Sequence, residues 1–151
     1  MFFLPCVIFI IASFSAYSQK YSTAADTVEL NKEYLKVSNN IADLTSKLTI
    51  AQNNLPGYHT KAGDAVTNAK SSMKESSEQA SKATNGDLAE AKSSKKKANK
   101  ALDAAEDAKD ADNKVKDQDK KIAKLSAQLK EKQDRLQELE TMRTAIRSTN
   151  Q

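Results

Sequence analysis

The side chains that could do chemistry are few and far apart. The chain of 151 residues has one histidine, His59, and one cysteine, Cys6. Nucleophilic catalysis of the Ser–His or Cys–His kind needs a base beside the nucleophile, and a zinc site needs several nitrogen or sulfur ligands. Neither arrangement is available here. We therefore expect a protein that is not an enzyme and that takes no cofactor, metal or small-molecule substrate.

Two weaker signals involve a group of aspartates. The run from Asp110 to Lys114 has the spacing of a calcium loop at its start, but the following glycine and the closing glutamate are missing. A charged helix surface is the better interpretation of this run. His59 is expected to be a solvated loop residue. The alternative is a pH-sensitive contact with Asp110, Asp112, Asp117 and Asp119, if the chain folds back so that their helix lies opposite His59.

The basic residues are concentrated in one place. Residues 61–100 contain nine lysines and five acids, an excess that equals the net charge of +4 of the whole chain. Five of these lysines form a basic patch: Lys92, Lys95, Lys96, Lys97 and Lys100. The patch is either a solvated face that aids solubility or a contact for an anionic envelope surface, such as lipid headgroups or cell-wall polymer. Nucleic acid is not expected, because no arginine or aromatic residue accompanies the lysines.

The first eighteen residues are typical of a signal peptide. Met1 to Ser18 carries no charged side chain, and Phe2 to Phe14 is almost wholly apolar. Ala16 and Ser18 place small residues at −3 and −1 of a cleavage site before Gln19. The apolar run is short for a membrane span. We therefore expect an exported protein, periplasmic or secreted, with a membrane anchor formed by residues 1–18 as the alternative.

The elements that must position these side chains are helices. Large apolar residues recur at alternating steps of four and three from Leu30 onward, the pattern of a coiled-coil seam. This pattern predicts a first helix over about residues 24–55. Its seam residues are Leu30, Tyr34, Val37, Ile41, Leu44 and Leu48, followed by Ala51 and Leu55.

A break or kink is expected near Pro56-Gly57, because proline lacks an amide donor and glycine permits unusual backbone angles. A second helix over about residues 60–84 follows. Its expected seam consists of small and polar residues together with two larger ones: Ala62, Val66, Ala69, Met73, Ser76, Ala80 and Ala83.

The dipeptide Asn85-Gly86 predicts a turn, and Asp87 with Glu90 resembles a capping box that starts a third helix over about residues 87–148. The first part of that helix has a stripe of small residues at Ala91, Ser94, Ala98, Ala101, Ala105 and Ala108. The last part has a seam of larger ones: Ile122, Leu125, Leu129, Lys132, Leu136, Leu139, Arg143 and Ile146. The two stripes differ in register, so a stammer is expected between Ala108 and Gln118.

Folding the chain back at Gly86 brings together positions whose numbers add up to about 172, since neighbours in an antiparallel hairpin have a constant sum. The bulky seams then face each other, and so do the small-residue seams. Residues 19–151 are thus predicted to be all-α, a long antiparallel coiled-coil hairpin. A two-stranded alanine seam is marginal by itself, so lateral association is expected, by self-association or with partner helices.

These features favour an exported, non-enzymatic structural or adaptor protein that acts through helix–helix association. Two alternatives remain open from the sequence. One is a protein that binds an anionic envelope surface through the basic patch near the hairpin turn. The other is a membrane-anchored periplasmic coiled coil that retains residues 1–18.

Overall fold

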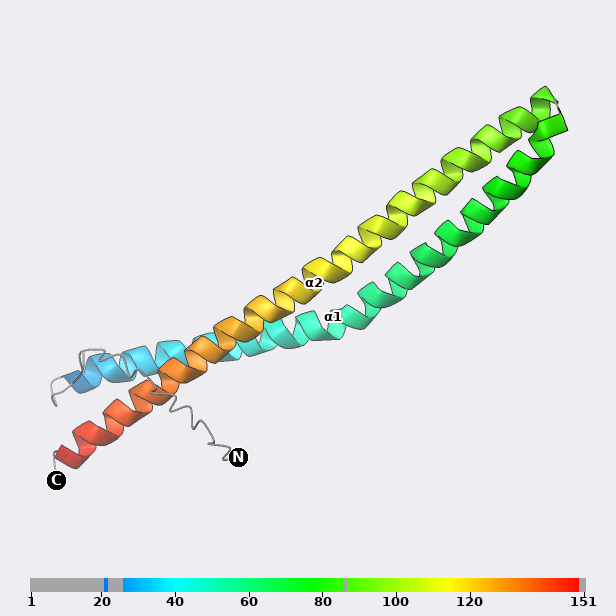
Figure 1. Cartoon of the computed structure of the whole chain (residues 1–151). Coiled ribbons are helices and arrows are strands. Elements are labelled where there is room, and N and C mark those ends of the chain that lie inside the picture. Colours follow the sequence, from blue (N-terminus) through cyan, green and yellow to red (C-terminus); the bar gives the residue numbers. More distant parts are fainter. Residues whose placement is uncertain (1–20, 22–25, 86, 150–151) are drawn as a thin grey trace, which may run out of the picture.

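Two long helices make up almost all of the protein. The computed structural model describes residues 21, 26–85 and 87–149, in which α1 spans Thr27–Lys82, a short 3₁₀ helix η2 spans Ala83–Asn85 and α2 spans Leu88–Thr149. Figure 1 shows α1 and α2 joined at one end, with the start of α1 and the end of α2 together at the other. The predicted all-helical hairpin is confirmed. The expected signal peptide and Gly86 lie outside the described residues.

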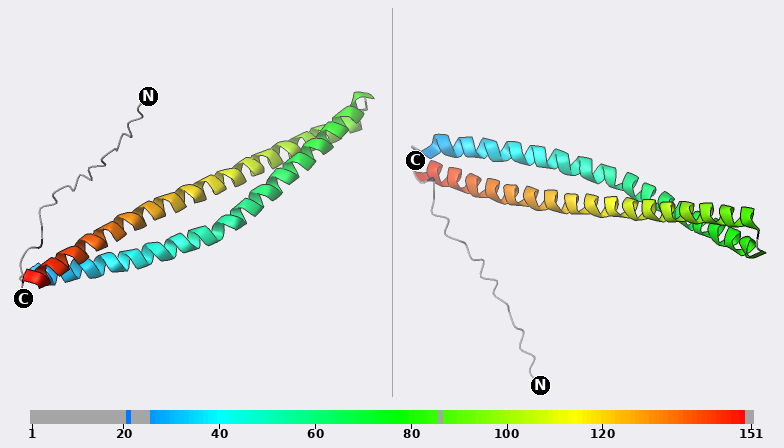
Figure 2. Two further views of the ribbon diagram at one scale, coloured as in Figure 1. Left: turned by 60° about the horizontal axis from the view of Figure 1, so that its bottom comes forward. Right: turned by 90° about the horizontal axis from the view of Figure 1, so that it is seen from above.

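The helices run antiparallel and contact each other from the open end to the turn. Tyr34 bonds to Glu140, the backbone of Ala51 accepts a bond from Gln118, and Glu75 pairs with Lys97. The residue numbers of these pairs add up to 174, 169 and 172, close to the expected sum of 172. The two views in Figure 2 show that the hairpin is elongated and gently curved.

Helix α1 continues through the position where we expected it to end. Pro56 lies inside the helix, and the division into helices of about 24–55 and 60–84 is therefore corrected to one helix, Thr27–Lys82. Both Pro56 and Gly57 are exposed, on the outer side of the helix. Pro56 cannot donate to the carbonyl of Gln52, but an exposed carbonyl can bond to water instead. The helix therefore tolerates proline here.

An unbroken α1 keeps the register of its seam. The steps of four and three continue past Pro56, and the residues that face α2 in the second half of α1 are buried or half-buried: Leu55, Tyr58, Ala62, Ala65, Ala69, Ser72, Ser76 and Gln79. Val66 and Met73, which the sequence placed in the seam, are 40% and 51% exposed. Their assignment to the seam, like that of the exposed Ala80, is wrong, because the stripe of buried and half-buried residues passes through Ala65, Ser72 and Gln79 instead.

Helix α2 likewise has a single register. Its seam passes through Ala101, Ala104, Ala108, Ala111, Val115, Gln118 and Ile122 in regular steps of three and four, all of them buried or half-buried. Ala91 and Ala98 are exposed, and the half-buried Glu90 and Lys97 take their places in the stripe, while Ala104 takes the place expected for Ala105. The stammer expected between Ala108 and Gln118 is therefore absent from this described stretch, and both halves of the hairpin share one stripe.

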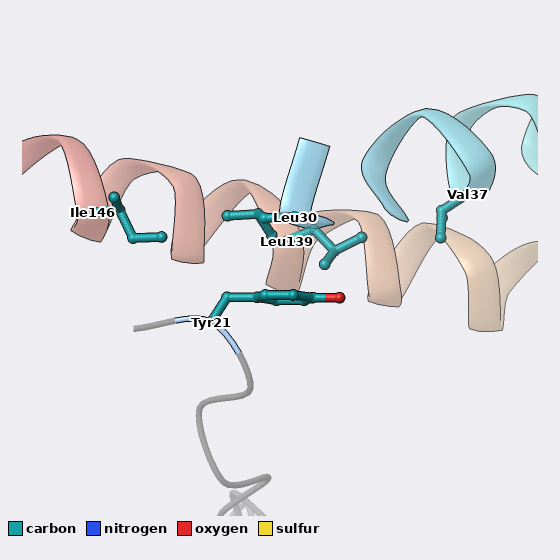
Figure 3. Packing of buried hydrophobic residues seen from close by; sticks show 5 residues of the cluster. All are labelled: Tyr21, Leu30, Val37, Leu139 and Ile146. Atoms are coloured by element: carbon teal, nitrogen blue, oxygen red, sulfur yellow. The ribbon is translucent and has the colours of Figure 1, made fainter. Parts of the chain in front are cut away.

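The tightest core lies at the open end. Leu30 of α1 and Leu139 of α2 are completely buried, and Val37 and Ile146 extend the cluster. Tyr21, which precedes α1 in the chain, lays its ring against this cluster, as Figure 3 shows. Toward the turn the buried residues shrink to alanines such as Ala69 and Ala101. The core is therefore bulky near the chain ends and thin near the turn.

The capping of α2 follows the sequence in part. Asp87 Oδ1 accepts a bond from the amide of Ala89 at 2.8 Å, which satisfies one of the free donors at the helix start. Glu90, the expected second half of a capping box, instead accepts a bond from Gln79 of α1. Glu90 thus ties the two helices together next to the turn.

We predict that Leu139→Ala lowers the free energy of unfolding by about 2–5 kcal/mol, since it leaves a cavity in the fully buried cluster. Leu35→Ala is the matched control, because Leu35 is 62% exposed on α1 and its loss is expected to cost less than about 0.5 kcal/mol beyond propensity effects. Urea unfolding followed by circular dichroism measures both. Equal losses for the two variants would contradict the core described here.

Candidate interaction surfaces

A hydrogen-bonded network of four side chains covers the bulky core at the open end. Glu33 of α1 stands at its centre. Glu33 Oε1 accepts two bonds from Arg135 of α2, at 3.0 Å from Nε and 2.7 Å from Nη2, and Glu33 Oε2 accepts a 2.6 Å bond from the Tyr21 hydroxyl. Arg135 Nη1 also donates to Glu138 at 2.7 Å. The network joins Tyr21 to both helices.

The charge of Arg135 is well supported. Partial burial works against its charged form, but the hydrogen bonds to Glu138 and Glu33 outweigh this effect and raise the pKa of Arg135 above its ordinary value. A second cross-helix contact lies about two turns farther along α2, where the Arg143 guanidinium is 4.4 Å from the centre of the Tyr34 ring. Both arginines therefore fasten α2 to α1 rather than serve as free binding groups.

All twelve predicted seam residues face the partner helix. Five are buried, namely Leu30, Val37, Leu125, Leu139 and Ile146. Seven are half-buried, namely Tyr34, Ile41, Leu44, Leu48, Ile122, Leu129 and Leu136. These side chains hold the hairpin together, and their burial leaves them little surface for another partner.

Polar groups interrupt the thin seam nearer the turn. Gln118 is buried and donates a 2.6 Å bond to the carbonyl of Ala51, a short way before Pro56. Ser72 and Gln79 are also buried. Within the described part of the chain, no buried side-chain nitrogen or oxygen lacks a hydrogen-bond partner. The seam near the turn thus gains register from hydrogen bonds but little hydrophobic stabilisation.

The predicted basic patch divides into two parts. Lys97 occupies a seam position, is half-buried and pairs with Glu75 at 3.7 Å. The other four, Lys92, Lys95, Lys96 and Lys100, are exposed outside the seam, with Lys95 on one flank of it and Lys100 on the other. Among the described residues none of these four has an acidic partner within ion-pair distance. They form an outward lysine row.

Among the described residues, four of the seven exposed large apolar side chains lie near the turn, and the other three, Val28, Leu35 and Ile50, lie on α1 toward the open end. On α1, Val66, Met73 and Ala80 each follow a seam residue and repeat every seven positions, so they form one row. On α2, Ala91 and Ala98 form the equivalent row. All five side chains are exposed.

In an antiparallel pair, residues that follow seam positions on the two helices lie on the same side, just as residues that precede them do. The opposite flank shows this rule directly, because Glu33 and Arg135 each precede a seam residue and touch at 2.7 Å. The two apolar rows therefore adjoin. Leu88 and Leu102 lie beside the α2 row at steps of three and four, and they are 70% and 60% exposed.

We call this surface the tip strip, and its residues are Val66, Met73, Ala80, Leu88, Ala91, Ala98 and Leu102. The repeat in the sequence placed Val66, Met73 and Ala80 in the seam of α1, and Ala91 and Ala98 in the stripe of small residues of α2. The signal that identifies the strip is the continuity of the seven-residue repeat through Pro56.

The aspartates near the middle of α2 do not build a site. His59 and the four aspartates at positions 110, 112, 117 and 119 are exposed, and no ion pair joins His59 to them. Asp112 instead pairs with Lys116 at 2.7 Å, and this hydrogen bond raises the pKa of Lys116. No cluster of His, Cys, Asp and Glu suited to a metal ion occurs in the described ranges.

No protein-family model, curated protein or solved structure matches the chain. In the part of the chain that the structure describes, neither helix has a segment apolar enough to span a membrane. The surfaces must therefore be interpreted from their own geometry and charge.

Two substitutions separate the roles of Tyr21. Tyr21→Ala removes a ring that packs on the buried cluster and is expected to lower the free energy of unfolding by about 2–4 kcal/mol. Tyr21→Phe keeps the ring and loses the bond to Glu33, so we expect a smaller loss of about 0.5–1.5 kcal/mol. Urea unfolding of the full chain gives both values. If Tyr21→Ala left stability unchanged, the Tyr21 ring would not belong to the core.

Proposed function

We propose that this chain is an exported, non-enzymatic helical hairpin that serves as a structural or adaptor protein through helix–helix association. The observation that carries the proposal is the tip strip. A folded helix pair normally buries its large apolar residues, but here Met73, Leu88 and Leu102 remain more than half exposed on one flank. Such a surface is suited to covering by another helix.

The shape of the hairpin supports this role. A helix rises 1.5 Å per residue, so the 62 residues of α2 extend over about 90 Å. The bulky core and the Glu33–Arg135 network fasten one end, and the tip strip lies toward the other. A rigid hairpin whose helices are fastened to each other at the open end, and whose apolar surface lies near the turn, can hold a partner protein at a fixed distance from the open end.

Chemical cross-linking in the native host tests the proposed association. A lysine-reactive reagent applied before lysis is expected to link Lys70 or Lys95 to a second polypeptide, because both lysines border the tip strip. Mass spectrometry identifies the linked peptides, and light scattering of the isolated material gives the mass of the assembly. Links that are confined to one molecule, together with a monomeric mass, would contradict an adaptor role.

A second candidate function rests on the outward lysine row. Lys92, Lys95, Lys96 and Lys100 are exposed, and their charges are not neutralised by acids within the hairpin. An array of this kind attracts lipid headgroups or anionic cell-wall polymer. In this alternative the hairpin presents its turn end to the envelope.

Replacing the four lysines of the row by glutamine tests this alternative. If the row binds the envelope, the wild-type chain should sediment with vesicles that contain phosphatidylglycerol, or with cell-wall polymer, more weakly as salt is raised. The glutamine variant should lose that binding. Lys120→Gln together with Lys121→Gln is the matched control, because both are exposed lysines of α2 farther from the turn. Equal binding by all three proteins would exclude the row as the contact.

The proposal of export, and its alternative of a membrane anchor, concern residues outside the described part of the chain. Mass spectrometry of the amino terminus of the native protein distinguishes them. Export with cleavage predicts a chain that begins at Gln19. A chain that retains residues 1–18 would favour the membrane-anchored alternative.

A further inference from the structure

We infer that the tip strip binds one amphipathic helix of another protein, whose apolar stripe is flanked by acidic residues, to form a local three-helix bundle. This inference rests on the proposed function and specifies the partner of its surface. On each helix the strip extends over fourteen residues, from Val66 to Ala80 on α1 and from Leu88 to Leu102 on α2, or about 21 Å of helix. The partner therefore needs about four turns of amphipathic helix.

The distribution of side-chain size favours a helix as the occupant. Ala80, Ala91 and Ala98 lie along the junction where the surfaces of α1 and α2 meet. Leu88 and Leu102 lie farther out on α2, at the edge of the strip. Small residues let a third helix approach the backbones closely, and the larger residues on the margin then pack against its sides. Val66 and Met73 supply the larger contacts from α1.

The charges beside the strip favour an acidic partner. Lys95 lies in the same row as Leu88 and Leu102, seven positions from each, and Lys70 lies next to Val66 and Met73 on α1. Neither lysine has an acidic partner among the described residues. Four of the nearby acids are engaged elsewhere: Glu75 with Lys97, Glu78 with Lys74, Glu90 with Gln79 and Asp87 with the amide of Ala89. Asp64 and Asp103 are exposed, but each precedes a seam residue and therefore lies on the flank opposite the strip.

The same charges argue against a second copy of this chain. Residues 61–100 carry nine lysines and five acids. Two tip strips placed face to face would bring Lys70 and Lys95 of both copies together, with no acid on the facing surfaces to neutralise them. Like charges held close together at an interface oppose association. An acidic helix meets no such repulsion.

A lipid surface fits the strip less well than a helix does. Interfacial helices combine bulky apolar residues, often aromatic, with basic residues that reach the same membrane plane. Residues 61–100 contain no aromatic residue, and alanines occupy the middle of the strip. In addition, Lys92, Lys96 and Lys100 of the outward lysine row project away from the strip, so one plane cannot meet both surfaces.

A designed peptide provides the probe. It has about 18 residues, with leucine and alanine along one face and glutamate on both flanks, which gives about five helical turns. A second peptide keeps the same apolar face and replaces each glutamate with lysine. Fluorescence anisotropy with the full chain is expected to show binding of the acidic peptide at least tenfold tighter than that of the basic one, and weakening as salt is raised.

Substitutions in the chain locate the binding surface. Leu102→Asp and Met73→Asp are expected to weaken binding of the acidic peptide by about tenfold or more, because each removes apolar contact and adds a like charge. Leu35→Asp is the matched control, since Leu35 is as exposed as Leu102 but lies near the open end; it should leave binding unchanged. Circular dichroism checks that all three variants remain helical.

Lys95→Glu gives a readout that a merely structural role would not produce. The variant should lose the preference for the acidic peptide and bind the basic peptide more tightly than the wild-type chain does. Leu102→Asp should weaken binding of either peptide to this variant.

Several results would overturn the inference. One is equal binding of the two peptides, and another is binding that ignores Leu102→Asp and Met73→Asp. Sedimentation that shows a dimer of the full chain, dissociated by Leu102→Asp, would identify a second copy as the occupant. Binding to phosphatidylglycerol vesicles that depends on Leu102 would identify a membrane. These results would contradict the acidic-helix partner but not the adaptor role itself. The adaptor role is tested separately, by whether cross-links to another polypeptide are found in the native host.

Discussion

Two helices packed side by side can bury only the residues that face each other along a single stripe. Every other feature of this hairpin is arranged around that limit. The chain places its bulky stripe residues near the open end, where Leu30 and Leu139 are fully enclosed. A residue outside the two helices contributes to the same cluster, because Tyr21 covers it from a third direction and donates a hydrogen bond to Glu33. The Glu33–Arg135 contact shields the same region.

The opposite end has the same geometry but smaller side chains. Ala69 and Ala101 are buried there and contribute little apolar area, while Ser72 and Gln79 need hydrogen bonds to be accommodated. The larger apolar residues of this half lie beside the stripe instead of within it. The register of the seam near the turn therefore has two effects: the seam there is weak, and the larger apolar residues are left exposed on one flank. As a result, the most stable packing lies at the open end, and the surface available to partners lies near the turn.

The architecture was accessible from the sequence because its signals are redundant. The repeat from Leu30 to Leu55, the repeat from Ile122 to Ile146 and the turn signal at Asn85-Gly86 all agree on one pairing. The register near the turn was not accessible by the same reasoning. Alanines occupy both possible stripes, so the presence of Val66 and Met73 favoured the wrong one.

The deciding information was the continuity of α1 through Pro56, and a local propensity argument assigns proline to a break. On the exposed side of a long helix, the missing hydrogen bond costs less than an interruption of the seam. Tyr21 was missed for a different reason. It precedes the helix and takes part in no repeat, so only its position in three dimensions reveals that it belongs to the core.

The uneven core also has a consequence for how the chain reaches its folded state. The contacts that contribute most stability join residues about a hundred positions apart, as in the buried cluster of Leu30 and Leu139. The entropy of closing so long a loop must be overcome before these contacts form, and the alanine pairs near the turn offer only weak intermediates on the way. The bulky core is therefore expected to form after the helices themselves and after the pairing near the turn. At high concentration, two newly made chains can exchange their α2 helices and satisfy the same seam in a domain-swapped dimer.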